Sequence, residues 1–325
     1  MAPPDVPYLR TPAERFQHVP GFPYEARYLQ YGNLRMAYVD ESAGGGSQTF
    51  LCLHGQPTWS YLYRKMIPAL LGYTTLNNTP SRRVVAPDLF GFGRSDKPSR
   101  DMDYTFNFHR DALLHFIRTL DLTNITLVVQ DWGGLLGLTL PIADPARFKR
   151  LIIMNTTIGV GAKPTQGFLD WRAFCNRSPD MKIGALIARG NPHLSKAETD
   201  AYDAPYPNQD YKGGVRRFPN LVPVSKEMEG VAISRESLHM YRTSDMFEDA
   251  GVFMACGMQD PVLGPPVMER LARVWKNGCY YAEIEDAGHF VQERGEKVAK
   301  LAIEVFEKRG EVEGVRRVAP GRANL

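Results

Sequence analysis

A run of apolar residues that ends at a carboxylate constrains this chain more than any other stretch. The pattern of residues 125–130 predicts a buried strand, and the small-residue run 133–137 predicts the tight start of a helix. Asp131 and Trp132 therefore fall on the turn between the two elements, at the carboxyl edge of a sheet. This arrangement is typical of a nucleophile elbow, a strained turn that exposes a reactive side chain, and here that side chain is an aspartate.

Other segments repeat this alternation of strand and helix. Two alternating segments around Gly32-Asn33 predict a β-hairpin. Apolar runs predict further buried strands at residues 49–53, 83–88, 151–155, 252–257 and 280–285, and helices are expected at 108–120, 136–142 and 293–307. The order predicts an α/β fold with a doubly wound, mostly parallel sheet of eight strands.

The rhythm breaks between residues 158 and 223, where aromatic and proline-rich pieces predict short helices and no buried strand. We expect a helical cap domain at 158–223, inserted into a core made of residues 1–157 and 224–325. Residues 72–81 are expected to form a surface excursion. The polar tail 310–325 is expected to be frayed and solvated, with binding of an acidic partner by its arginines as the alternative.

The net charge and the distribution of charged residues indicate which classes of molecule the chain binds. The 325 residues include 39 basic and 36 acidic side chains spread along the chain, giving a net charge of +3. Such a chain has no strong field to steer nucleic acid or an anionic membrane, so neither is expected as a partner, and a neutral small molecule fits better. No sustained heptads or repeats are found, and a monomer is the expectation.

Cysteine usage and the termini give further expectations. The cysteines, Cys52, Cys175, Cys256 and Cys279, are too scattered for a disulfide framework or a metal site, so buried reduced thiols and no metal are expected. No leader pattern and no run of about 18 apolar residues is present, which favours a cytoplasmic protein.

Three predicted strands end near Asp131, Asp260 and His289, in the order nucleophile, acid, histidine. Singly, an aspartate after a strand is more often a turn or cap residue, and a histidine beside a glycine more often makes a satisfied polar contact. Jointly, at one predicted sheet edge and in this order, they match the triad of α/β-hydrolases.

Four segments then resemble one family within that fold. They are FLCLHGQPTWSYLYR at 50–64, APDLFGFGRSDKP at 86–98, VVQDWGG at 128–134 and DAGHFVQE at 286–293. Together they resemble the haloalkane dehalogenases, in the branch whose catalytic acid follows the seventh strand, over roughly residues 8–308. Asn155 stands near the position of the acid in other branches, and an amide cannot serve as one, which strengthens Asp260.

The resemblance implies hydrolysis of haloalkanes to alcohol, halide and a proton, without a cofactor. Asp131 would displace halide from carbon and form an alkyl ester, and water activated by His289 would hydrolyse it while Asp260 orients the imidazole. Trp132 and Trp171 would bind the halide through their indole N–H groups, although Trp171 has packing as its alternative. The other two tryptophans, Trp59 and Trp275, are expected to be structural.

The ester step needs donors for an oxyanion, and the backbone N–H groups of Gln56 and Trp132 are the natural candidates. This branch of the family usually has glutamate where Gln56 stands, so the exchange keeps the backbone donor and removes a carboxylate. Apolar residues expected to line the substrate pocket, with ordinary packing as the alternative, are Phe168, Phe218, Pro219 and Leu263.

Two other functions fit parts of this pattern. An epoxide hydrolase would share the aspartate and histidine but needs acidic hydroxyls, for which Tyr202, Tyr206, Tyr211 and Tyr241 are candidates. Gln130, where epoxide hydrolases commonly have histidine, and the two indoles favour halide chemistry. A ligand receptor on the same scaffold need not keep all three catalytic groups, and all three are present here.

Overall fold

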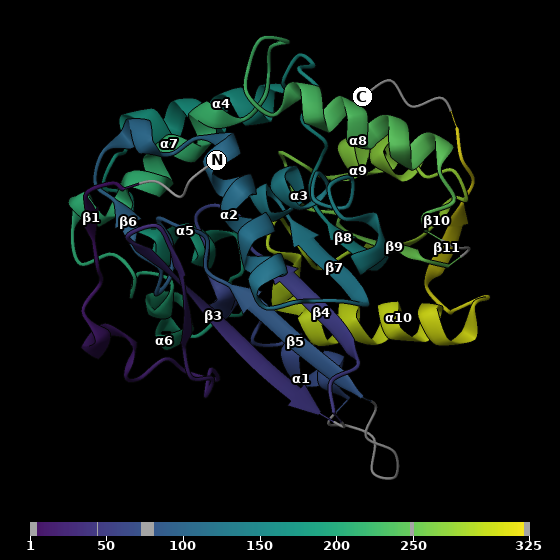
Figure 1. The fold of residues 1–325 in the computed structure, drawn as a ribbon, viewed down its shortest axis with the longest axis horizontal. Coiled ribbons are helices and arrows are strands. Elements are labelled where there is room, and N and C mark those ends of the chain that lie inside the picture. The colour runs from purple at the N-terminus through teal and green to yellow at the C-terminus, as the bar shows by residue number, and fades with distance from the viewer. Residues whose placement is uncertain (1–4, 44, 73–80, 248–249, 322–325) are drawn as a thin grey trace.

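A nine-stranded sheet forms the centre of the computed structural model, which describes residues 5–43, 45–72, 81–247 and 250–321 (Figure 1). Its strand order is β11-β10-β9-β8-β7-β4-β5-β3-β2. The strands are β2 (Arg27–Tyr31), β3 (Leu34–Ala43), β4 (Gln48–Leu53), β5 (Arg82–Pro87), β7 (Ile125–Gln130), β8 (Phe148–Met154), β9 (Val252–Gly257), β10 (Cys279–Ile284) and β11 (Val315–Val318). The six strands from β10 to β5 run parallel, and β2, β3 and β11 run antiparallel at the edges. A separate pair joins β1 (Tyr8–Leu9) to β6 (Lys97–Pro98).

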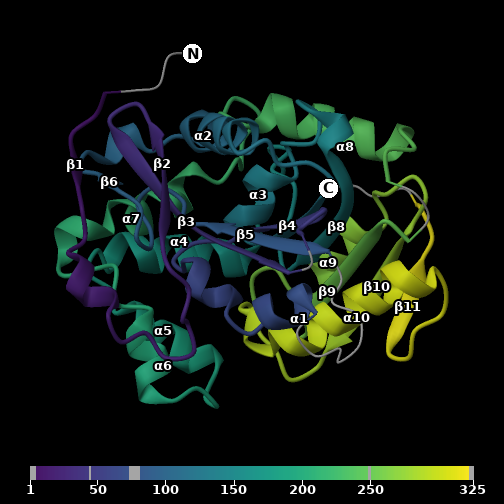
Figure 2. The same ribbon diagram turned by 60° about the horizontal axis from the view of Figure 1, so that its bottom comes forward.

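Helices cover both faces of this sheet. Helices α1 and α10 pack together below one face, while α2, α3 and α8 cover the other (Figure 2). The α-helices are α1 (Ile67–Leu71), α2 (Phe106–Thr119), α3 (Trp132–Gly137), α4 (Gln166–Arg177), α5 (Ile183–Gly190), α6 (Lys196–Ala201), α7 (Gly213–Leu221), α8 (Val231–Thr243), α9 (Pro265–Ala272) and α10 (Gly295–Lys308). Short 3-10 helices are η1 (Ala13–Phe16), η2 (Ser60–Tyr63), η3 (Asp101–Asp103), η4 (Pro145–Arg147), η5 (Gln209–Lys212) and η6 (Val291–Arg294). The doubly wound α/β architecture is thus confirmed.

Residues 158–223, called the inserted segment below, lie between β8 and α8. They carry α4, α5, α6 and α7, and all of them are described, so this segment contains no strand. In Figure 1, α4 and α7 lie on the same side of the sheet as α8, away from α10.

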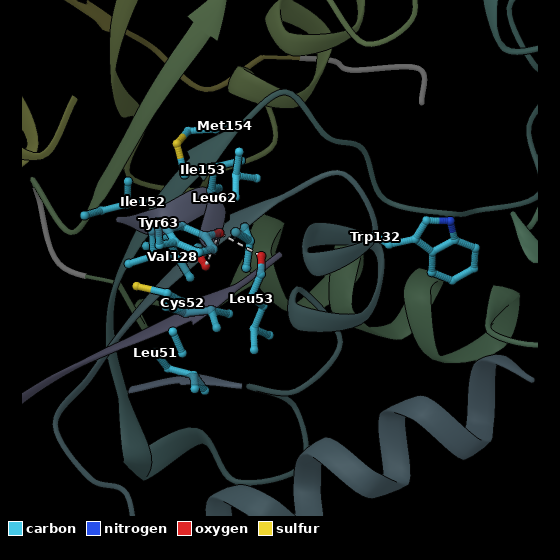
Figure 3. Packing of buried hydrophobic residues seen from close by; sticks show 14 of the residues in the cluster. Leu51, Cys52, Leu53, Leu62, Tyr63, Val128, Trp132, Ile152, Ile153 and Met154 are labelled. Atoms are coloured by element: carbon cyan, nitrogen blue, oxygen red, sulfur yellow. Dashed lines mark hydrogen bonds between the residues drawn. The ribbon is translucent and has the colours of Figure 1, made fainter. Parts of the chain in front are cut away.

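The core forms because the central strands are apolar along their whole length. All six residues of β7 and of β9 are buried, as expected for parallel strands covered on both faces. Figure 3 shows Leu51 to Leu53 beside Val128 and Ile152, with the Tyr63 hydroxyl donating to the carbonyl of Leu53 at 2.8 Å. The predicted buried, reduced thiols are confirmed for all four cysteines.

The predicted hairpin is confirmed, and one predicted helix is wrong. Strands β2 and β3 pair across Gly32, which has the positive φ of 62° that such a turn requires. The helix expected at 136–142 instead begins at Trp132 and ends at Gly137. Pro141 explains the early end, because proline lacks an N–H and restricts the residue before it to extended conformations.

The expected count of eight strands is also wrong, because the tail supplies a ninth. Residues 315–318 form β11 and pair antiparallel with β10, with Val318 opposite Cys279. Val318 is 6% exposed, so this part of the tail packs against the core and is not frayed. The predicted surface excursion at 72–81 lies mostly outside the described residues, which resume at Ser81.

No helix among the described residues is long and apolar enough to cross a bilayer.

Candidate active site

The turn at Asp131 holds the strained geometry that the sequence predicts. Asp131 has φ 51° and ψ −124°, an unusual conformation for a residue other than glycine, and it directly precedes α3. Glycine is required two residues after Asp131, because a Cβ on Gly133 would lie 1.9 Å from the carbonyl oxygen of Leu53. Gly55 is equally constrained, since its Cβ would lie 2.3 Å from Asp131 Oδ1. The loop after β4 therefore packs directly on the carboxylate.

The three predicted triad residues lie together at the carboxyl ends of β7, β9 and β10. His289 Nδ1 lies 2.7 Å from Asp260 Oδ2, and His289 Nε2 lies 3.6 Å from Asp131 Oδ2. The Asp260 side chain is fully buried, whereas the Asp131 carboxylate keeps 16% of its surface exposed. One imidazole thus lies between a buried carboxylate and an accessible one.

The charges in this group perturb each other strongly. Burial alone would lower the pKa of His289, but the carboxylates of Asp260 and Asp131 outweigh burial and raise it to about 10. Burial favours the neutral form of Asp260, yet the charge of His289 and the hydrogen bonds to Asp260 hold its pKa below the ordinary value. Asp260 therefore stays ionised and stabilises positive charge on the imidazole.

Asn155 supports Asp260, a role that the sequence did not predict. Its Nδ2 donates to Asp260 Oδ2 at 2.9 Å and to the Gly257 carbonyl at 3.1 Å, while the Gly257 N–H donates to its Oδ1 at 2.7 Å. The Val262 N–H donates to the other oxygen of Asp260 at 2.8 Å. An amide at the end of β8 thus fixes the acid that follows β9.

Gln130 contacts the imidazole of His289. In the sequence it was noted only because epoxide hydrolases commonly have histidine at this position. Its Nε2 lies 2.9 Å from His289 Nε2 and 3.0 Å from the His289 carbonyl oxygen. A carbonyl oxygen can only accept, which assigns the amide nitrogen to this side. When the imidazole is neutral, His289 Nε2 accepts the second N–H through its lone pair, and Nδ1 carries the proton donated to Asp260. This is the tautomer that a general base at Nε2 requires.

Two backbone N–H groups were predicted to stabilise the oxyanion, and the structure places one of them on Asp131 and the other at the first residue of α3. The Gln56 N–H donates to Asp131 Oδ1 at 2.8 Å. The N–H of Trp132 belongs to the first residue of α3, where backbone N–H groups have no intrahelical acceptor.

The Trp132 indole is buried beside the turn and packs edge-on against Phe218 of α7, with 4.7 Å between ring centroids. Among the described residues, no hydrogen bond joins this indole N–H to a protein acceptor. By contrast, the Trp59 indole donates to the Ala201 carbonyl at 3.2 Å. The Trp275 ring packs against Tyr241 at 4.9 Å, although its buried N–H also lacks an acceptor among the described residues. Those contacts agree with structural roles for Trp59 and Trp275.

Trp171 lies in the middle of α4, one helical turn from Gly167 and one from Cys175. Gly167, Trp171 and Cys175 are spaced by four residues and share one face of the helix. At one end of this face, a Cβ on Gly167 would lie 2.5 Å from the Pro261 carbonyl oxygen. At the other end, burial raises the pKa of the Cys175 thiol to about 12, and the charge of Asp131 adds to this rise. Trp171 lies between Gly167, which approaches the loop after β9, and Cys175, which senses the charge of Asp131.

Comparison with known proteins agrees with this geometry. A family model described as the alpha/beta hydrolase fold matches residues 48–296. A haloalkane dehalogenase from Psychrobacter cryohalolentis is 38% identical over 307 residues, covering 91% of this chain and 97% of the relative. Another from Mycobacterium marinum is 40% identical over 310 residues, covering 91% and 98%. The chain belongs to the haloalkane dehalogenases.

A solved structure of the same family extends the comparison. The haloalkane dehalogenase DpaA from Paraglaciecola agarilytica NO2 is 46% identical, covers 92% of this chain and 98% of its own, and superposes with a TM-score of 0.86. That structure is described as tetrameric, which opposes the monomer expected for this chain, and the monomer stays a prediction.

The four residues expected to line the substrate pocket lie in two different places in the structure. Phe168 and Leu263 line one cavity of about 120 Å³, between the inserted segment and the loop after β9. Phe218 and Pro219 do not line that cavity, and both are buried in α7, where Phe218 contacts Trp132. Phe218 therefore supports the indole beside the nucleophile.

Proposed function

We propose that the chain hydrolyses haloalkanes through a covalent alkyl ester on Asp131, with residues 158–223 acting as a cap over the triad. The observation that carries this proposal is the different setting of the two carboxylate oxygens. Oδ1 accepts the Gln56 N–H at 2.8 Å, whereas Oδ2 lies 3.6 Å from His289 Nε2 and accepts no backbone N–H among the described residues. Oδ2 is therefore the better nucleophile, and Oδ1 is the oxygen placed to become the ester carbonyl.

In the first step, a lone pair of Asp131 Oδ2 attacks the carbon that bears the halogen. The carbon–halogen bond breaks with its electron pair, and halide leaves as an ester forms. Halide needs no proton in order to leave, but it needs hydrogen-bond donors in a site with little water. Among the described residues the indole N–H of Trp132 has no protein acceptor, and Trp171 lies on α4 between Gly167 and Cys175. Both observations support these two indoles as the donors.

In the second step, water gives one proton to His289 Nε2 and its oxygen attacks Cγ of Asp131. Negative charge develops on Oδ1, where the N–H groups of Gln56 and Trp132 stabilise it. The bond from Cγ to the alkyl oxygen then breaks, the alkoxide takes the proton from His289, and the regenerated acid releases the second proton. Esterification removes the charge of Asp131, so part of the rise in the pKa of His289 disappears when the base is needed.

Three of the four tyrosines that were candidates for an epoxide hydrolase are engaged elsewhere. The Tyr202 hydroxyl bonds to Glu293, the Tyr206 hydroxyl donates to the Pro57 carbonyl at 3.3 Å, and the Tyr241 hydroxyl donates to the Leu138 carbonyl at 2.7 Å. Burial raises the pKa of all three phenols, which makes them poor acids. These contacts favour halide as the leaving group.

Product analysis separates the candidate functions. The protein is incubated with a panel of brominated and chlorinated alkanes and with styrene oxide, and released halide, acid and diol are measured. Halide and acid in equal amounts are expected. Diol without halide would establish the epoxide hydrolase instead, and binding of the alkanes without any turnover would support a receptor.

Two variants test the covalent intermediate. Asp131→Asn is expected to abolish steady halide release, since an amide is a poor nucleophile. His289→Gln should still release about one halide per protein and then hydrolyse the ester about 10²–10⁴-fold more slowly. Intact-mass measurement of that variant should show one added alkyl group. Unchanged turnover of Asp131→Asn would refute the assignment of the nucleophile.

A further inference from the structure

Three hydrogen bonds fasten the loop after β4 to the inserted segment, and all three are buried. Gln56 Nε2 donates to the Val215 carbonyl of α7 at 3.0 Å. The next residue of the loop, Pro57, accepts the hydroxyl of Tyr206 at 3.3 Å. Trp59, two residues later, donates its indole N–H to Ala201. The position of this loop is therefore set by the inserted segment as well as by β4.

Gln56 makes the contact that lies nearest to the chemistry. Its backbone N–H donates to Asp131 Oδ1, and its side chain, 3% exposed as a residue, reaches α7 in the opposite direction. Because both contacts belong to one residue, release of the side chain frees the backbone N–H to move. The Val215 carbonyl accepts only, so the amide nitrogen is assigned to that side.

A carboxylate at position 56 could not make this contact. The glutamate usual in the branch that this chain resembles would place an acceptor against the Val215 carbonyl, and it would add a second negative charge beside Asp131. The amide supplies a donor without a charge. Helix α7 also carries Phe218, which packs on Trp132 at 4.7 Å, so a single helix contacts the residues on both sides of the Asp131 carboxylate.

We infer that the side-chain amide of Gln56 is a positioning group for ester hydrolysis. By bonding to the Val215 carbonyl, it holds the backbone N–H of Gln56 on the oxygen of Asp131 that becomes negative in the second step. This inference rests on the proposed ester mechanism. It predicts unequal effects on the two steps, because the N–H stabilises the carboxylate before alkylation and the oxyanion during hydrolysis. Displacement of the Gln56 N–H should therefore leave the rate of halide release unchanged and slow the hydrolysis of the ester.

The test compares Gln56→Met and Gln56→Glu with the unmodified protein in rapid-quench halide release, at several values of pH. Both variants should release about one halide per protein rapidly and then turn over about tenfold more slowly, less than the 10²–10³-fold cost of losing an oxyanion donor outright. Gln56→Glu should recover at low pH, where a protonated carboxyl can donate to Val215. Gln56→Met has no such group and should keep a constant ratio to the unmodified protein.

Tyr206→Phe is the matched control, since it removes a different bond between the same loop and the inserted segment. It should show no pH dependence of its own. The other ionisable groups around residue 56 include Asp131, His289, Cys175 and His54, and they are shared by all the proteins compared. A ratio to the unmodified protein therefore isolates position 56. Wild-type turnover by both Gln56 variants, without a burst, would overturn the inference.

Failure of the proposed function would be visible separately, as absence of halide release from the unmodified protein. The contact itself can then be read from the melting temperature. Burial raises the folded-state pKa of a glutamate introduced at position 56, so its stability is fully present below the unfolded pKa and is lost as pH rises. Gln56→Glu should therefore melt increasingly below the unmodified protein as pH rises. A difference that does not change with pH would contradict the contact.

Discussion

Three neighbours act on the His289 imidazole, and they do not act in the same direction. The carboxylates of Asp260 and Asp131 favour the protonated ring. The amide N–H of Gln130, 2.9 Å from Nε2, favours the neutral ring because it needs the lone pair. The basicity of His289 therefore depends on a neutral residue that directly precedes the nucleophile.

Replacement of Gln130 tests this balance. In Gln130→Met the donor to Nε2 is lost, so the neutral imidazole loses a hydrogen bond worth about 0.5–1.5 kcal/mol and the pKa of His289 rises. The acid limb of the steady-state rate should move to higher pH by up to about one pH unit, since about 1.4 kcal/mol corresponds to a factor of ten. The pH–rate profile measures this shift, and an unmoved acid limb would show that the contact does not tune the base.

The residues that carry charge could be found from the sequence, whereas those that orient them could not. Asp131, Asp260 and His289 each follow a strongly apolar strand, so the pattern placed them at one sheet edge. Asn155 and Gln130 also end strands, but an amide has no fixed chemistry and bonds to whatever the fold places beside it. Their partners are 105 and 159 residues away in the chain, a separation that only the folded sheet brings together.

At the scale of single elements, strands with a long apolar run were predicted correctly. Elements were predicted wrongly where one or two residues set their ends or hid their apolar pattern. Strand β9 was predicted with its observed bounds, because its apolar run follows Gly251 and ends just before the polar pair Gln259-Asp260. The end of helix α3 was placed too late, at 142 instead of Gly137, although its start was expected at the glycines. In the structure they permit the close approach to β4 and β8, where a Cβ on Gly134 would lie 2.1 Å from Thr156. Strand β11 was missed because two of its four residues are arginines.

The packing of the tail against β10 can be tested directly. Val318→Ser removes a side chain that is buried opposite Cys279, at a cost of about 2 kcal/mol, and should lower the melting temperature by several degrees. Glu311→Ser changes an exposed residue of the same tail and should leave it unchanged. Thermal unfolding followed by circular dichroism measures both. Equal melting temperatures for the two variants would show that the tail is frayed, as its composition predicts.

At the scale of the whole molecule, a buried ionic cluster joins the inserted segment to the loop that carries the base. Arg64 donates to both oxygens of Glu293 at 2.8 Å and to Glu198 of α6 at 2.9 Å. Glu293 belongs to η6, four residues after His289, and also bonds to Tyr202. The cluster was not visible in sequence, because its members come from three segments that lie at least 91 residues apart.

Removal of one charge from this cluster should destabilise the whole fold. Burial alone would raise the pKa of Glu293, but the Arg64 guanidinium holds it below the ordinary value, so its contribution is present above the unfolded pKa and is lost as pH falls through the folded one. Glu293→Gln leaves Arg64 incompletely paired and should lower the free energy of unfolding by about 3 kcal/mol at neutral pH. The matched control is Glu296→Gln, which breaks an exposed pair with Lys300 and should change it by less than about 0.5 kcal/mol. Denaturant unfolding at neutral and acid pH measures both, and a Glu293→Gln deficit that persists undiminished in acid would show that the loss is steric and not ionic.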